Sequence, residues 1–521
     1  MKRNIISIFN FQFSIALCAV LLAGCRQESD NVLNYAYNDN MVFAKAKGSY
    51  AAKFDVLWKG LNTNYALWDY ENEQGLDWDA VYDEYMPKFA ALDSAQSAVT
   101  DAELKALLDS VVAPLHDGHL TVMMLNHQTG TNIATAPGRL RVQRERGEEY
   151  QEVKDKPIKI DYYTTNGELV EFKTANTNTF ETIAQPAISA IRQKVNELQT
   201  KLKDGTITPE ERDTLTIYRQ IFAEMKETIK GSVTDAIEAY NLIVIRYAYL
   251  NIPGLVEVDA KLNEYGLTIA YGLFKGNIAY LGFDHFKLSI YLNDAYTRQM
   301  FGTPSASTQA VIDSVRATWR AWFEAIQAHH KAGDLGGVII DIRSNGGGLI
   351  NDYRYVLGAL LPAGDMHDCN ARFKRGPGRY DYSPILPQYL STLTEEHVEV
   401  TEPIVVLCNC ASVSMAEHIA YGAKVLDNAK LIGTRTWGGF SILSGTESYT
   451  DNYAGHVGIQ GVTPVYCYTP MEVALTRDDE VVEGHGIEPD IEVGLNLYLY
   501  HGALGPDNQL DRALQFVRTG N

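Results

Sequence analysis

The region up to residue 126 combines two helical patterns with one alternating segment. Apolar side chains recur at i, i+3, i+4 and i+7 over 78–85 and again over 104–111, which predicts two amphipathic helices. A Thr-x-x-Glu capping pattern precedes the second of them. Apolar and polar residues then alternate over 120–124, as in a half-buried strand. The pattern predicts a helical N-terminal region that ends in a strand, with His119 at the junction.

The middle of the chain, residues 127–275, is more charged and less regular. It begins with short strand-like pieces such as 158–163. A helical pattern then covers 187–203, a turn follows at Asp204-Gly205, and Pro209 stands at the first position of a second helix. We interpret this helical hairpin as part of an inserted cap whose charged side chains face solvent.

Continuous apolar runs of strand length mark the next region. They cover 277–282, 338–340 and 404–407, and a long amphipathic helix is predicted over 308–328. Strands that are apolar on both faces, with helices between them, indicate a sheet covered on both sides. The fold class predicted is therefore α/β, and α+β overall. Functional side chains in such folds gather where the strands end.

Composition narrows the possible functions. The chain has 521 residues, and 45 Lys and Arg against 65 Asp and Glu give a net charge of −20. This length predicts two or three packed units. Because a strongly acidic surface repels phosphate, we expect no nucleic-acid partner. The sequence does not define an oligomeric state.

The N-terminal segment has the pattern of a targeting signal. Lys2 and Arg3 precede an apolar stretch that ends in Leu-Ala-Gly-Cys, and this ending resembles a bacterial lipobox. The resemblance implies cleavage of a signal peptide, residues 1–25, before a lipidated Cys25, followed by a polar linker over 26–40. Beyond Cys25 no apolar run is long enough to span a bilayer. We expect a lipoprotein of the cell envelope, with the outer membrane favoured.

The remaining cysteines do not indicate a metal site. Cys369, Cys408, Cys410 and Cys467 lack the paired spacing of a zinc motif. We interpret them as small buried apolar side chains. An exported compartment would also permit a disulfide between them.

Three turns carry candidate chemistry. The run 341–348 ends in three glycines directly after a buried strand, and such a run can leave backbone N–H groups open to an incoming oxygen. The run 412–417, Ser-Val-Ser-Met-Ala-Glu, lies between a strand and a helix, where free amides favour negative charge. The run 115–120, Leu-His-Asp-Gly-His-Leu, joins the second predicted helix to the first strand.

With these turns the chain resembles the C-terminal processing, or tail-specific, serine peptidases. The residues that carry the resemblance are the runs 341–348, 412–417, 433–438 and 486–491, in the order found in that family. The resemblance implies a crotonase/Clp-protease-like core with an N-terminal helical domain and an inserted helical cap. The predicted borders are 41–126 for the helical domain, 127–275 for the cap or a degenerate PDZ-like region, 276–500 for the peptidase core and 501–521 for a C-terminal tail.

The same resemblance implies a nucleophile. Matching the family's Ser-x-x-Glu pattern selects Ser414 over Ser412. The bacterial processing branch has a general-base lysine 25 residues after the serine, whereas this chain has Gly439 there. Lys424 and Lys430 lie at other offsets, so a Ser-Lys dyad is not expected.

A histidine is the expected replacement for the lysine. The run 115–120 looks like the Asp-x-His element of the tricorn-core branch, which selects His119 over His116. An imidazole with an ordinary pKa of about 6.5 suits proton abstraction near neutral pH. The resemblance to that branch also implies Glu483 as the group that orients the histidine, with Glu488 and Asp490 as competitors.

The implied reaction is hydrolysis of peptide bonds through an acyl-enzyme on Ser414. The resemblance implies that the oxyanion is held by the amides of Met415 and Gly347, and that neither a metal nor a cofactor takes part. The expected substrate is a peptide or protein tail, and the expected membrane contact is the lipid anchor. Two alternatives stay open: a catalytically silent lipoprotein that binds peptides or other ligands, and acyl transfer or hydrolysis on non-peptide substrates.

Overall fold

The computed structural model describes residues 46–153, 163, 166–177, 185–228, 262, 265–304, 306–376, 378–392, 397–443, 456–495 and 506–521. The expected signal peptide, Cys25 and the linker lie outside these residues, as does nearly all of the strand-like piece 158–163. Within the described residues, no helix has both the length and the apolar character needed to cross a bilayer.

The chain divides into two compact units. Unit one comprises Met1–Gly147, Cys369–Gln388 and Trp437–Gly486, and unit two comprises Glu148–Asp368, Tyr389–Thr436 and Ile487–Asn521. These units differ from the predicted domain borders, because two segments of the predicted peptidase core belong to unit one. The local patterns that suggested the borders do not reveal such long-range pairing.

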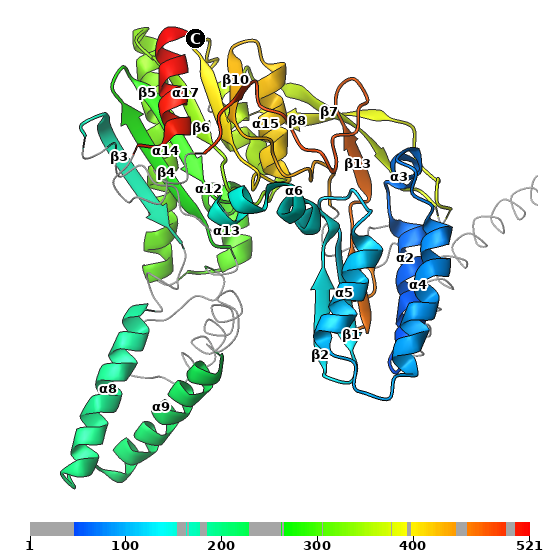
Figure 1. The fold of residues 1–521 in the computed structure, drawn as a ribbon. Helices are drawn as coiled ribbons and strands as arrows, with labels where there is room; N and C mark the ends of the chain where they lie inside the picture. The colour runs from blue at the N-terminus through cyan, green and yellow to red at the C-terminus, as the bar shows by residue number, and fades with distance from the viewer. Residues whose placement is uncertain are drawn as a thin grey trace, which may run out of the picture. The chain divides into compact units, whose positions relative to one another are not determined.

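Unit one begins with helices (Figure 1) whose buried side chains belong to one apolar core. They are α2 (Tyr50–Asn64), α3 (Trp68–Glu73), α4 (Trp78–Asp93) and α5 (Asp101–Val112). The two predicted amphipathic helices correspond to α4 and α5. The capping box predicted before α5 is also present, since Thr100 Oγ1 accepts the Glu103 amide and the Glu103 side chain accepts the Thr100 amide. Helix α6 (Pro137–Val153) is interrupted by non-helical dihedrals at Arg146.

A four-stranded antiparallel sheet completes this core, in the order β11-β12-β1-β2. Its strands are β1 (Thr121–Asn126), β2 (Thr131–Thr135), β11 (His456–Val457) and β12 (Val465–Tyr468). Strand β1 is the strand predicted from the alternating pattern. It pairs with β12 in a register that opposes Thr121 to Tyr468. A further pairing joins β13 (Glu472–Leu475) to the end of β7 (Asp365–Phe373), and β8 (Leu386–Ser391) extends that sheet.

Unit two contains a seven-stranded mixed sheet in the order β14-β10-β9-β6-β5-β4-β3. The strands are β3 (Leu169–Asn176), β4 (Thr268–Phe274), β5 (Ile278–Phe283), β6 (Gly337–Asp341), β9 (Ile404–Cys408), β10 (Ala429–Gly433) and β14 (Ile491–Glu492). Pairing is parallel from β5 to β14 and antiparallel among β3, β4 and β5. Every residue of β5, β6 and β9 is buried, so both faces of the central sheet are covered. The predicted α/β class is confirmed.

Helices cover this sheet. Helix α14 (Ala306–Ala332) contacts β3 to β5, α15 (Met415–Val425) contacts β9 and β10, and α17 (Asn508–Thr519) contacts β6, β9 and β10. Shorter helices are α12 (Leu288–Leu292), α13 (Asp294–Phe301), η2 (Ile350–Tyr355) and η3 (Leu357–Leu360). Residues 501–521, predicted as a tail, include α17, whose Leu510 and Leu514 lie in the core. The buried residues Leu510, Ala513, Leu514 and Val517 of this helix recur at helical spacing.

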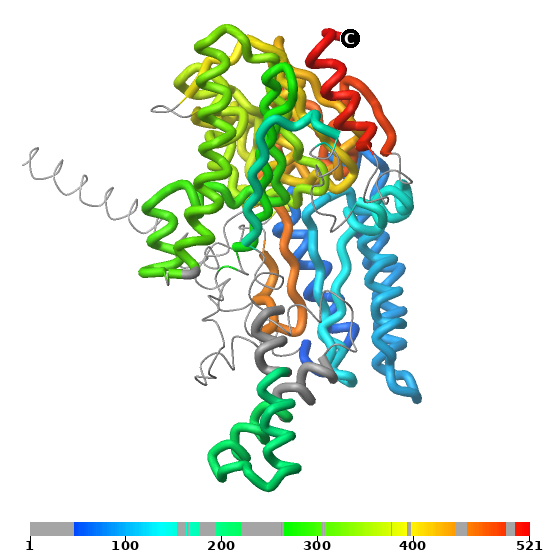
Figure 2. Tube along the Cα trace, turned by 90° about the vertical axis from the view of Figure 1, so that its left-hand side faces the viewer, coloured from blue at the N-terminus to red at the C-terminus, as the bar shows by residue number. Residues whose placement is uncertain are grey.

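The predicted helical hairpin is present in unit two. It consists of α8 (Gln185–Lys203) and α9 (Pro209–Thr228), joined by a short turn (Figure 2). Leu198, Leu215 and Tyr218 are buried. Thr208 caps α9, because its hydroxyl oxygen accepts the amide of Glu211 at 3.2 Å. The hairpin therefore has its own small apolar contact and a defined helix start.

Candidate active site

Ser414 occupies a strained turn between a strand and a helix of unit two. Strand β9 ends at Cys408, α15 begins at Met415, and Ser414 has φ 60° and ψ −123°. A non-glycine residue with positive φ is uncommon and costs about 1–3 kcal/mol, so it persists only where surrounding contacts enforce it. A strained strand-to-helix turn is also the geometry that presents a nucleophilic serine in α/β hydrolases.

Buried Glu417 is one of the contacts that enforce this turn. Its Oε2 accepts the Ser414 amide at 3.2 Å, and its Oε1 accepts the Thr436 hydroxyl at 2.6 Å. Glu417 is fully buried. The glutamate of the Ser-x-x-Glu pattern therefore fixes the backbone of the serine.

Ser412 has a different task in the same turn. Its hydroxyl donates to the Ile342 carbonyl at 2.7 Å and accepts the Asn409 amide at 3.1 Å. Ser412 is fully buried, whereas Ser414 is partly exposed. These bonds join the serine turn to the end of β6. The geometry therefore favours Ser414 over Ser412 as the reactive residue.

The glycine run lies against Ser414, as the sequence predicts. Gly347 has φ +82°, and a Cβ placed on it would lie 2.6 Å from Ser414 Cβ and 3.2 Å from the Met415 nitrogen. Its own amide donates to Asn345 Oδ1 at 2.9 Å. An oxyanion at this amide would therefore compete with the Asn345 side chain, so the oxyanion roles of Gly347 and Met415 stay predictions.

His119 and Glu483 lie together in unit one. Nδ1 of His119 is 3.9 Å from Oε1 of Glu483, and the side chains are 8% and 0% exposed. Glu483 also accepts the Gly118 amide at 2.7 Å and the Ser441 amide at 2.6 Å. The Gly118 amide, which is on the turn that carries His119, and the Ser441 amide therefore fix the position of the Glu483 carboxylate. Of the three predicted catalytic residues, the structure brings these two together within one unit, whereas Ser414 belongs to unit two.

The electrostatics of Glu483 favour its charged form. Burial disfavours charge, but the contact with His119 and the two backbone donors outweigh it and lower the pKa of Glu483. An ionised carboxylate beside a ring nitrogen orients the imidazole and stabilises its protonated form. Glu483 therefore has the charge that an orienting group needs.

The other histidine of the 115–120 run has its own carboxylate. Nδ1 of His116 lies 2.7 Å from Oε2 of buried Glu71, and the His116 amide donates to Oε1 of the same group at 2.7 Å. Arg141 donates to the His116 carbonyl at 2.9 Å. These bonds hold the start of the turn, so the structure gives His116 an anchoring contact.

The two competing carboxylates have other partners. Asp490 pairs with Lys424 at 3.0 Å and accepts the Leu431 amide at 2.8 Å. Glu488 lies 3.7 Å from Arg435, and its side chain is 58% exposed. Lys424 is thereby accounted for as a partner of Asp490. The described contacts favour Glu483 over both competitors.

Gly439, which stands where the processing branch has its lysine, belongs to a close backbone contact in unit one. A Cβ on Gly118 would lie 2.0 Å from the Gly438 carbonyl oxygen and 2.7 Å from Gly439 Cα. The Trp437 indole N–H donates to the Gly118 carbonyl at 3.0 Å. The backbone at the lysine position thus packs directly on the turn that carries His119.

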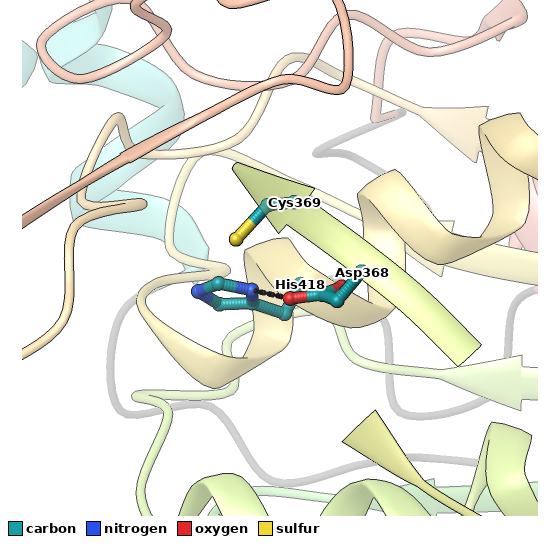
Figure 3. A group of neighbouring side chains, drawn as sticks. All are labelled: Asp368, Cys369 and His418. Atoms are coloured by element: carbon teal, nitrogen blue, oxygen red, sulfur yellow. Dashed lines mark hydrogen bonds and ion pairs between the residues drawn. The ribbon is translucent and has the colours of Figure 1, made fainter. Parts of the chain in front are cut away.

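One buried pair was missed by the sequence reasoning. His418 follows Ser414 by one helical turn, and its Nδ1 lies 2.6 Å from Oδ2 of Asp368 (Figure 3). The two side chains are 3% and 1% exposed. Cys369, drawn with them, is the next residue along β7. No local motif links 368 to 418, so only the folded chain shows that His418, four residues after Ser414, is paired with Asp368.

His119 and two neighbouring carboxylates also form a possible donor set for a metal. Asp117, His119 and Glu483 each offer an atom within 4.8 Å of the others. However, the Asp117 and Glu483 oxygens already accept five hydrogen bonds from amides and a hydroxyl. This use of the oxygens favours a role in holding the histidine turn.

Part of the chain is similar to a known peptidase family. Residues 309–493 match the model of peptidase family S41. Over 174 residues the chain is 29% identical to a carboxy-terminal-processing protease of Bartonella bacilliformis, a match that covers 33% of this chain and 35% of that protein. The chain thus spans about a third of the length of this relative. The segment that matches the family model holds the glycine run and the Ser414 turn.

Two solved structures are among those that align with this chain. Mature CPAF aligns with a TM-score of 0.46 and 12% identity over 91% of this chain and 98% of its own. The photosystem II D1 C-terminal processing protease aligns with a TM-score of 0.26 and 18% identity over 42% of each chain.

Proposed function

We propose that this protein is a serine peptidase that cleaves peptides or protein tails. Ser414 is the nucleophile, His119 the general base, and Glu483 the group that orients His119. The observation that carries the proposal is the strained Ser414 turn, which lies inside the segment that matches the S41 family model. The contact of His119 with a buried, ionised Glu483 supports it from the other unit.

The reaction follows from these roles. His119 takes the proton of the Ser414 hydroxyl as the oxygen attacks the peptide carbonyl carbon. The C–N bond then breaks, and the leaving amine takes the proton from His119, which leaves an acyl-enzyme on Ser414. Water repeats the sequence: His119 takes a proton from the attacking water and returns it to the Ser414 oxygen as the carboxylic acid leaves.

The first test measures both turnover and covalent labelling. The purified protein is assayed on a quenched peptide library and is treated with a fluorophosphonate, whose adduct is located by peptide mass spectrometry. We expect hydrolysis and a single adduct on Ser414. Ser414→Ala should lower hydrolysis by at least about 10³-fold and abolish the adduct. Labelling elsewhere, or hydrolysis unchanged in Ser414→Ala, would overturn the proposal.

Matched variants separate the candidate residues. Ser412→Ala loses two structural hydrogen bonds but should keep the adduct on Ser414. His119→Ala should lose about as much activity as Ser414→Ala, because residues of one catalytic unit do not act additively. His116→Gln and His418→Gln each remove one of the two alternative candidates for the general base. Both variants should retain most labelling. Loss of labelling in His418→Gln with normal labelling in His119→Ala would transfer the general base to His418.

We also propose that Cys25 is lipidated and tethers the protein to the cell envelope. The support is the Leu-Ala-Gly-Cys ending of the N-terminal signal. Metabolic labelling with a palmitate analogue tests it. We expect label in the full chain and none in Cys25→Ser, and fractionation places the labelled chain in the inner or outer membrane.

A further inference from the structure

Asp117 makes the local contacts that shape the turn before His119. Its Oδ1 accepts the amides of His119 and Leu120 at 2.7 and 2.8 Å. One carboxylate oxygen thus holds two successive amides, and the peptide units of His119 and Leu120 are fixed relative to it. Asp117 is fully buried, so water does not replace these bonds when they weaken.

The second oxygen of Asp117 connects the turn to a distant part of unit one. Oδ2 accepts the hydroxyl of Thr469 at 2.6 Å, and Thr469 is also fully buried. Thr469 directly follows β12, the strand that pairs with β1 beyond His119. The backbone on both sides of His119 is therefore held by contacts with the C-terminal end of β12: Asp117 through Thr469, and β1 through strand pairing.

Asp117 and Glu483 hold different parts of the turn that carries His119. Glu483 faces the imidazole ring and fixes the Gly118 amide, whereas Asp117 fixes the His119 backbone. Burial and the neighbouring Glu483 charge raise the pKa of Asp117 to about 7. The hydrogen bonds from the Thr469 hydroxyl and the His119 amide act in the opposite direction and favour the charged form of Asp117.

We infer that Asp117 is a positioning residue for the proposed peptidase reaction and that Thr469 fixes it in that role. Because two buried residues set the direction of the His119 Cα–Cβ bond, a small change in either displaces the imidazole. A small displacement of the general base lowers the rate of proton transfer more than it alters substrate binding. The inference rests on the proposed function of His119.

Thr469→Val tests it without removing volume. This variant should lower kcat by about 10-fold or more with KM within about twofold, and it should slow acylation of Ser414 by the fluorophosphonate to the same extent. Thr469→Ser restores the hydroxyl and should restore kcat. Asp117→Asn should lower kcat similarly where it folds. Thr463→Val is the matched control, because it removes a hydroxyl that donates to the Ile459 and Val465 carbonyls in the same hairpin. It should leave kcat unchanged.

A second measurement does not depend on catalysis. Hydrogen exchange of the segment 116–121 should be faster in Thr469→Val than in wild type or Thr463→Val. Wild-type kcat in Thr469→Val, a loss that Thr469→Ser fails to rescue, or unchanged exchange would overturn the inference. If the wild-type protein neither hydrolyses peptides nor labels at Ser414, the proposed function fails, and exchange alone decides whether the Asp117–Thr469 contact holds the turn.

Discussion

Substitution of Gly347 by alanine tests the geometry around Ser414 most directly. The added Cβ would lie 2.6 Å from Ser414 Cβ and 2.7 Å from the Val413 carbonyl oxygen, separations that real Cβ atoms do not show. The backbone of this residue has φ +82°, which an alanine tolerates poorly. The serine turn would therefore have to move.

Two costs contribute to the magnitude. Left-handed backbone at a non-glycine residue costs roughly 1–2 kcal/mol, and overpacking of a rigid site adds roughly 1–3 kcal/mol. In a unit of about 300 residues, a destabilisation of about 3 kcal/mol would lower Tm by about 5 °C. Displacement of the nucleophile and of a predicted oxyanion donor should reduce kcat/KM by about 10²-fold or more.

Gly346→Ala is the control for this experiment. Its Cβ would approach only the edge of the His285 ring, at 3.3 Å, and that side chain is 45% exposed and can turn away. Melting curves and fluorophosphonate labelling of both variants give the comparison. A Gly347→Ala protein that melts and labels like Gly346→Ala would show that the glycine run does not constrain the serine, and the reasoning would be refuted.

Three further predictions concern charge and burial. The lowered folded-state pKa of Glu483 means that its charge stabilises the fold above the unfolded value of about 4.3, and that this contribution is lost as pH falls through the folded pKa. The stability gap between wild type and Glu483→Gln should therefore be largest near neutral pH and narrow in acid, as urea titrations at several pH values would show. Arg343→Ala leaves Asp341 and Asp507 buried without their shared cation, at 2.6 and 2.7 Å, and should cost about 3–5 kcal/mol in urea unfolding. Burial raises the pKa of the Cys408 and Cys467 thiols, so native protein should react with a thiol reagent at these sites far more slowly than unfolded protein; equal rates would contradict their burial.

Elements with a strong local period were predictable from the sequence. The apolar spacing of α4 and α5 predicts that these helices exist, and the capping pattern and Pro209 predict the starts of α5 and α9. The unbroken apolar runs of β6 and β9 predict the covered sheet. These signals are local, since each depends on residues within one or two turns.

Partners distant in sequence were not predictable in the same way. Nothing near residue 121 specifies that β1 pairs with β12, and nothing near 418 specifies Asp368. For this reason each predicted domain is one continuous stretch of chain, whereas each of the two units is built from stretches that are distant in sequence.

The candidate site shows the same division. Ser414 and His119 came from family-like motifs, whereas the bonds that hold their turns, from Glu417 and Asp117, involve atoms that motifs do not describe. The bond from the Gly347 amide to Asn345 is of the same kind. Motifs identify the candidate reactive groups, whereas the folded structure shows which of the neighbouring backbone amides already donate a hydrogen bond.

The antiparallel pairing of β1 with β12 also sets the order of events during synthesis. The paired residues are separated by more than 300 positions, so at about 5–20 residues per second the ribosome exposes β1 for roughly 15–70 s before its partner strand is made. During that time the nascent helices cover only part of their apolar surface, and one edge of the growing hairpin has open backbone groups. A chaperone that covers this edge during synthesis would therefore raise the yield of native protein.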